Sequence, residues 1–164
     1  MPTRKKTRFG ELPPSFNFVL NPYPGERLSR CPFCEQKTGQ RKRPLLIHID
    51  PQQLLALNYT CRYCPTCDLL IAHKHEIEHL LTELFKQTAP ESIGNYYLIF
   101  GTVERKTWRE NMKQPLPFSE IVAHTSDFIN HYQELRMRQQ GWFPKDYEPP
   151  ILEPPPSKEW IRPL

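Results

Sequence analysis

The sequence predicts a small α+β protein, in which a three-stranded unit with four cysteines is followed by an amphipathic helix, another strand and a long C-terminal helix. Three observations support this class. Four of the 5 cysteines stand in C-x-x-C pairs, apolar residues recur first at strand spacing and then at helix spacing, and many of the 19 prolines lie toward the two ends. Because proline fixes φ and removes a backbone donor, proline-rich arms are expected to flank the folded part.

The chain of 164 residues suits one domain with tails. Residues 1–30 are predicted to form an irregular, basic and proline-rich arm. Residues 31–72 hold both cysteine pairs, and residues 73–141 are expected to continue the α+β domain and to pack on that unit. Residues 142–164 form a proline-rich tail, which either straps Trp142, Phe143 and Trp160 onto the domain or offers a polyproline ligand to an aromatic groove.

Three stretches within residues 31–72 are predicted to be strands. Residues 44–49 are apolar and end at Asp50-Pro51. Residues 57–63 contain Tyr and Thr, which favour extended structure, and residues 69–72 follow the second cysteine pair. Further along, residues 96–100 are predicted to be a buried strand that ends at Gly101.

Helical periodicity appears in two longer stretches. Residues 75–87 place five apolar side chains on one stripe: Ile77, Leu80, Leu81, Leu84 and Phe85. Residues 118–140 carry the longest helical pattern, which Gly141 would end. Thr125 or Ser126 would cap a second helix there, so this segment forms one helix or two. Residues 104–111 fit a short helix or a frayed turn.

The strongest motif is a pair of C-x-x-C sequences, Cys31 to Cys34 and Cys64 to Cys67, with 29 residues between them. Four thiolates bind Zn²⁺ tetrahedrally, and two C-x-x-C turns supply them in pairs. An odd number of cysteines arranged in this way favours metal ligation in a reducing compartment over a disulfide framework. Cys61 also forms a C-x-x-C pair with Cys64, but it is predicted to be a buried residue on its strand.

Residues 31–72 resemble the zinc-ribbon family, whose mark is two C-P-x-C knuckles separated by a hairpin. The resemblance implies that Cys31, Cys34, Cys64 and Cys67 hold one structural zinc ion. In both knuckles the residue after the last cysteine departs from the family's glycine, since Glu35 and Asp68 stand there. The resemblance also implies a binding or scaffold role, frequently in nucleic-acid handling, and a closed site that does not activate water.

A second motif, His75-Glu76-x-x-His79, matches the helix of zinc proteases. On a helical wheel both histidines lie opposite Ile77, so the motif is expected to be the polar outer face of the amphipathic helix. Glu78 stands where those enzymes have an uncharged core residue. A zincin-like hydrolase that uses His75, Glu76 and His79 stays an alternative.

Charge is uneven, because residues 1–43 carry ten Lys or Arg against three Glu, whereas the rest carries twelve basic against fifteen acidic residues. A basic segment predicts an acidic partner, nucleic acid being the most frequent, or only a solvated tail. Tyr96, Tyr97 and Trp108 beside basic residues 105, 106 and 109 offer a further cluster that would stack bases and neutralise phosphates, or would simply be a small core beside a solvated face. Apolar runs are too short for a membrane span, and no apolar signal core follows the N-terminal charges, so a cytoplasmic protein is expected.

These observations predict a non-catalytic, zinc-stabilised binding module that contacts nucleic acid or an acidic protein surface. No small-molecule substrate is indicated. An interaction scaffold that uses its proline-rich arms is the first alternative. The residues predicted to make the basic contacts are Arg4, Lys5, Lys6, Arg8, Arg41, Lys42 and Arg43.

Overall fold

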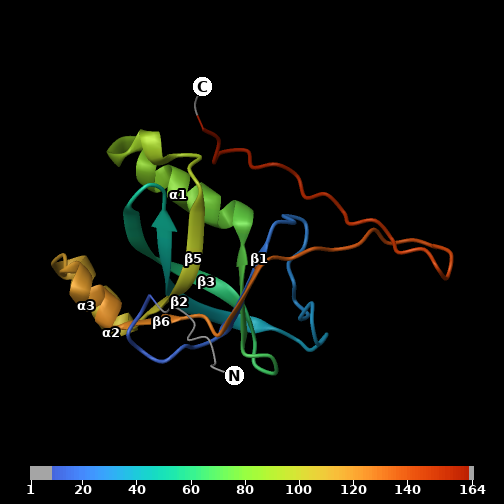
Figure 1. The fold of residues 1–164 in the computed structure, drawn as a ribbon, viewed down its shortest axis with the longest axis horizontal. Helices are drawn as coiled ribbons and strands as arrows, with labels where there is room; N and C mark the ends of the chain where they lie inside the picture. Colours follow the sequence, from blue (N-terminus) through green and yellow to red (C-terminus); the bar gives the residue numbers. More distant parts are fainter. Residues whose placement is uncertain (1–8, 163–164) are drawn as a thin grey trace, which may run out of the picture.

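The computed structural model describes residues 9–162 and is built on one curled, seven-stranded sheet (Figure 1). Its α+β class agrees with the prediction. In chain order the elements are β1 (Asn17–Asn21), β2 (Gly39–Ile49), β3 (Gln53–Cys64), β4 (Leu69–His73), α1 (Lys74–Thr88), the 3₁₀ turn η1 (Pro90–Ser92), β5 (Tyr97–Val103), α2 (Arg105–Lys113), α3 (Phe118–Ala123), β6 (Thr125–Asp127) and β7 (Asn130–Glu134).

The strands predicted around the cysteine pairs form the centre of this sheet. Its order is β6-β5-β2-β3-β4-β1-β7. β2 and β3 pair antiparallel along all of β2, and β4 continues antiparallel on the other side of β3. Because β2 also pairs with β5, its apolar half from Leu45 to Ile49 has a strand on each side and is largely buried. The three predicted strands are confirmed, and each is longer than its sequence pattern indicated.

The sheet curls until its two edge strands come close to each other. β6 and β7 occupy opposite edges, yet only Phe128 and Ile129 separate them along the chain. The Phe128 N–H donates to the carbonyl of Phe100, and the Ile129 N–H donates to the carbonyl of Phe16. Inside the curl the rings of Phe18 and Phe128 stack with their centroids 4.5 Å apart. One short crossing therefore joins both edges around the main apolar core.

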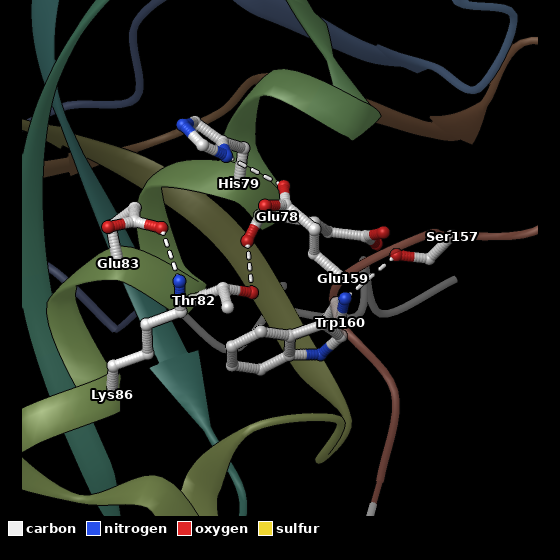
Figure 2. A network of polar contacts seen from close by, with 8 residues as sticks. All are labelled: Glu78, His79, Thr82, Glu83, Lys86, Ser157, Glu159 and Trp160. Carbon is white, nitrogen blue, oxygen red and sulfur yellow. Dashed lines mark hydrogen bonds and ion pairs between the residues drawn. The ribbon is translucent and has the colours of Figure 1, made fainter.

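Helix α1 lies along the curled sheet and confirms the helix predicted over residues 75–87 (Figure 1). Its buried residues are Ile77, Glu78, Leu81, Thr82 and Phe85. The predicted stripe is wrong at Leu80 and Leu84, which are 38% and 47% exposed. The buried face is rotated toward Glu78 and Thr82 because Tyr97 of β5 and Trp160 of the tail cover that side, and Figure 2 shows Trp160 beside Thr82.

The irregular arm predicted over residues 1–30 contains a strand of the sheet. β1 pairs in parallel with β4 on one side and with β7 on the other. Phe18 and Val19 are at most 1% exposed, so this segment belongs to the core. The prediction missed it because the segment is only five residues long and its partners lie more than fifty residues away, where no local pattern marks a parallel pairing.

The prediction of a long helical segment over residues 118–140 is wrong. Helix α3 ends at Ala123, and Thr125 and Ser126 are buried where β6 pairs with β5. β7 then pairs with β1. Strand partners for both edges of the sheet outweigh a helical pattern whose apolar residues are sparse, since propensity is a weak prior.

β5 extends the predicted strand through Gly101 to Val103. A side chain at this glycine is excluded, because a Cβ atom there would lie 2.4 Å from the Ser126 carbonyl oxygen of β6. Gly101 therefore permits the close approach of β6 and does not end the strand.

The tail contains no helix or strand over the described residues 142–162. It runs away from the sheet and returns to α1 (Figure 1). Trp160 is buried and its indole N–H donates to the Asn95 carbonyl, so the tail is a strap at this point. The same prediction is wrong for Trp142, which is 88% exposed.

Candidate metal centre

The fold brings the two C-x-x-C turns to the same end of the β2–β3 hairpin. Cys31 and Cys34 precede β2, Cys64 is the last residue of β3, and Cys67 lies in the turn before β4. Because Gly39 is opposite Tyr63 in the antiparallel register, the start of β2 and the end of β3 lie together. The segment before β2 supplies one cysteine turn, and the end of β3 with the turn that follows it supplies the other.

The spacing of the four sulfur atoms is compatible with a tetrahedral metal site. The Sγ atoms of Cys31 and Cys67 are 3.9 Å apart, those of Cys34 and Cys64 are 3.4 Å apart, and all four lie within 4.8 Å of one another. A tetrahedron with zinc–sulfur bonds of about 2.3 Å has edges of about 3.8 Å. The two measured edges bracket this value. The donor set and its spacing therefore fit a metal site with four cysteine ligands.

The residue after each pair adopts the backbone conformation for which glycine is usual. Glu35 has φ +63° and Asp68 has φ +49°. These are the two positions at which the sequence departs from the zinc-ribbon pattern, so both turns keep the left-handed conformation without glycine. The Glu35 N–H donates to the Cys31 carbonyl, and the Tyr63 hydroxyl donates to the Asp68 carboxylate over 2.6 Å, which holds the second turn in place.

An apolar cluster includes Cys31 and Cys64, and Cys34 and Cys67 pack against it. Cys31 and Cys64 are buried and Cys34 and Cys67 are half-buried. The apolar residues packed around them come from β1, β4 and the chain on either side: Val19, Leu28, Leu69, Ile71 and Leu135. This packing is compatible with a metal site formed by the four cysteines.

The thiols respond differently to this environment. Burial raises the pKa of Cys31, and burial together with hydrogen bonds to neighbouring thiols raises the pKa of Cys67 to about 12. The backbone N–H of Gln36 lowers the pKa of Cys34 by donating to its sulfur. A cation bound to the thiolates of Cys31 and Cys67 would offset the cost of removing their protons.

Cys61 lies apart from this group, as the sequence predicts. It is fully buried in the main core on β3, opposite Arg41 of β2. Burial raises the pKa of its thiol to about 12, so it is an inert apolar residue at neutral pH.

The His75-Glu76-x-x-His79 motif lies at the start of α1 with its side chains in separate contacts. The Glu76 carboxylate accepts a hydrogen bond from the Tyr59 hydroxyl, and His79 Nδ1 lies 2.7 Å from the Glu159 carboxylate. His79 forms a possible ligand group with Glu83 and Glu159, all three of them exposed. Within residues 9–162 no such group of three includes His75.

The basic residues predicted on β2 take two different positions. Arg41 and Arg43 are half-buried, with the Arg41 guanidinium 4.0 Å from the ring centroid of Tyr63 and the Arg43 guanidinium 5.3 Å from that of Phe16. Lys42 is exposed and alternates to the other face of the strand. Arg4, Lys5, Lys6 and Arg8 lie outside the described residues.

Helix α2 adds basic residues next to Lys42 that the sequence did not connect with β2. Arg105 donates from its guanidinium to the Lys42 carbonyl over 2.6 Å. Together with Asn58, Trp108 and Arg109 these residues line a hollow of about 130 Å³, which we call the basic hollow. Its members are far apart in the chain, so only the strand–helix contact reveals the cluster.

Comparison of the chain with protein-family models, with curated proteins and with solved structures gives no match. Among the described residues no helix is both long and apolar enough to span a membrane.

Proposed function

We propose that this chain is a non-catalytic binding module that one structural zinc ion stabilises and that binds nucleic acid through the basic hollow. Zinc is the metal that four thiolates at tetrahedral spacing favour, and a four-thiolate shell has no open position for catalysis. The zinc would fix the end of the β2–β3 hairpin from which Lys42 projects.

The observation that carries the nucleic-acid proposal is the composition of the basic hollow. Lys42, Arg105 and Arg109 surround it, and the half-buried indole of Trp108 forms part of its wall. Cations that neutralise phosphates beside an aromatic ring on which a base stacks are the usual elements of single-strand binding. A volume of about 130 Å³ admits a phosphate group but not a large metabolite.

The electrostatics of the surrounding residues support the same proposal. Burial lowers the pKa of Arg43, and the nearby charges of Arg105 and Arg41 lower it further. Within residues 9–162, the ion pairs involve none of Arg41, Lys42, Arg43 and Arg105. Positive charge is thus concentrated around β2 without an ion-paired carboxylate among the described residues, which favours a polyanionic partner.

Fluorescence anisotropy with a labelled oligouridylate of about twenty nucleotides, longer than one binding site, tests the proposal. Lys42→Gln combined with Arg109→Gln should lower the affinity. It should also flatten the plot of log K against log salt by about 1.4, because each phosphate contact on a single strand contributes about 0.7. Trp108→Ala should lower the affinity without changing the slope.

The matched control combines Lys86→Gln in α1 with Arg138→Gln in the segment after β7, which removes the same charge at two sites where the cations have carboxylate partners. Equal loss in the control would show that net charge alone governs binding. Equal competition by polyglutamate would favour an acidic protein surface over nucleic acid, and absence of oligouridylate binding would refute the proposal.

A further inference from the structure

The curled sheet is open on one side, between β5 and β7. β5 pairs with β6 only over Gly101–Val103, so within residues 9–162 its outer edge at residues 97–100 has no strand partner. A cleft of about 860 Å³ lies at this opening, and β7 and the tail form its other walls. This volume falls within the range of ligand sites in proteins, roughly 300–1,000 Å³.

A buried carboxylate faces this cleft from α1. Glu78 is only 3% exposed. Its Oε2 accepts the Tyr97 hydroxyl over 2.7 Å, whereas its Oε1 is buried without a hydrogen-bond partner in the described chain. Burial and the charge of Glu78 raise the pKa of Tyr97, which keeps that hydroxyl a donor. Burying a carboxylate oxygen without a hydrogen-bond donor costs free energy, and a donor on a bound ligand would offset this cost.

The other ionisable groups around the cleft already have contacts or face solvent. Lys74 pairs with Glu134 over 2.8 Å, and Asp127 accepts two backbone N–H groups. His131 Nε2 lies 2.7 Å from a β5 carbonyl, and burial lowers the pKa of this histidine, which favours the neutral ring. Arg136 is exposed at the rim. Among the described residues that line this cleft, Glu78 Oε1 is therefore the buried side-chain atom without a hydrogen-bond partner.

Several aromatic side chains also form the wall of the cleft. Phe18, Tyr97, Phe128 and Trp160 all line the cleft. An anion would be repelled by Glu78, and a neutral apolar molecule would leave its charge uncompensated. An ammonium group supplies both the charge and the N–H donor, and aromatic faces attract cations as well as apolar groups.

We propose that this cleft binds a primary amine with an apolar body, whose ammonium group donates to Glu78 Oε1 while its body lies among Phe18, Phe128 and Trp160. The amine belongs either to a small molecule or to a lysine side chain of a peptide, since both present the same group. This site is separate from the metal centre and from the basic hollow.

Benzylammonium is the probe, and its neutral analogue benzyl alcohol is the comparison. Each is titrated into the metal-loaded full chain while the NMR signal of the Trp160 indole N–H is followed. Benzylammonium should shift this signal saturably and benzyl alcohol should bind far more weakly. Glu78→Gln keeps the shape of the side chain and should weaken benzylammonium binding by about 10- to 100-fold, the usual effect of losing a hydrogen bond to a charged group.

Glu83→Gln is the matched control, because it removes an exposed carboxylate from the same helix without touching the cleft. It should leave benzylammonium binding unchanged. Equal binding of the two probes, equal weakening by both variants, or no saturable shift in the parent chain would overturn the proposal. If Glu78→Gln does not fold, the comparison of the two probes on the parent decides.

A third probe distinguishes the two sources of the amine. A lysine tripeptide with blocked ends carries the same ammonium group on a peptide backbone. Tighter binding of the tripeptide than of benzylammonium would support a peptide lysine, and tighter binding of benzylammonium would support a small amine.

Discussion

Replacing Cys64 by serine should release the metal and unfold the surrounding part of the chain. Cys64 ends β3 and is fully buried, and its sulfur lies 3.4 Å from that of Cys34 in the other turn. Serine presents a hydroxyl that binds zinc poorly beside three thiolates. The variant therefore removes the link between the two turns while changing one atom.

The size of the effect follows from the residues that the metal orders. Residues 28–38 and 65–68 lie outside the strands around the centre. Ordering these 15 residues costs about 22 kcal/mol at about 1.5 kcal/mol each. The five apolar side chains packed around the sulfurs return about 8–15 kcal/mol. The deficit of about 7–14 kcal/mol is close to the binding free energy of structural zinc, which is about 10–16 kcal/mol.

Elemental analysis and hydrogen exchange test this prediction together. Protein purified without added metal should carry one zinc per chain, and Cys64→Ser should carry none. Amide protection should fall in β4 and in the half of β2 that begins at Gly39, while the half of β2 between β3 and β5 keeps more protection. Cys61→Ala is the control, because Cys61 lies in the main core and its loss should leave the zinc in place.

The reasoning would be refuted by a parent chain that binds no zinc. It would equally be refuted if Cys61→Ala released the metal and Cys64→Ser retained it, since the ligand set would then be different. A variant that loses zinc but keeps full amide protection in β4 would contradict only the free-energy argument and not the ligand set.

Three further predictions concern the fold. Glu35→Gly should stabilise the chain by about 1 kcal/mol in urea unfolding, because it relieves a left-handed φ of +63°; an unchanged midpoint would contradict this. Gly101→Ala should lower the midpoint, because its Cβ would lie 2.4 Å from the Ser126 carbonyl oxygen. Burial lowers the folded-state pKa of His131, so its contribution to stability is present above the unfolded pKa of about 6.5 and declines as the pH falls below it. His131→Gln should therefore reduce the loss of stability between pH 7.5 and 6.0, as urea unfolding at the two pH values measures, and an equal loss in the variant and the parent would contradict this.

Local sequence patterns predicted the parts of the fold whose contacts are themselves local. β2, β3 and β4 follow one another in an antiparallel meander, and α1 is long enough to show its period. The four cysteines were also predictable as a group, because two short motifs at the ends of a hairpin come together by chain geometry alone. Cys61 is separated from them because Cys64-Pro65-Thr66-Cys67 matches the first pair better than Cys61-Arg62-Tyr63-Cys64 does.

Contacts between distant segments could not be predicted in this way. β1 becomes a strand because β4 and β7 offer it partners, and residues 125–134 become β6 and β7 because the sheet has two open edges there. The same holds for function. Lys42 and Arg105 lie 63 residues apart and meet only through the packing of α2 on β2. Glu78 likewise has a buried, unpaired oxygen because Tyr97 and Trp160, which are distant in the chain, cover its side of α1.

The candidate metal centre is connected through Tyr63 to the part of β2 that carries the proposed nucleic-acid contacts. Tyr63 precedes the ligand Cys64, its ring contacts the Arg41 guanidinium, and its hydroxyl holds the turn at Asp68. Lys42 follows Arg41 and contributes to the basic hollow. A metal bound by Cys64 would therefore also fix the part of β2 that carries these cations, whereas the far half of β2 is held by β5.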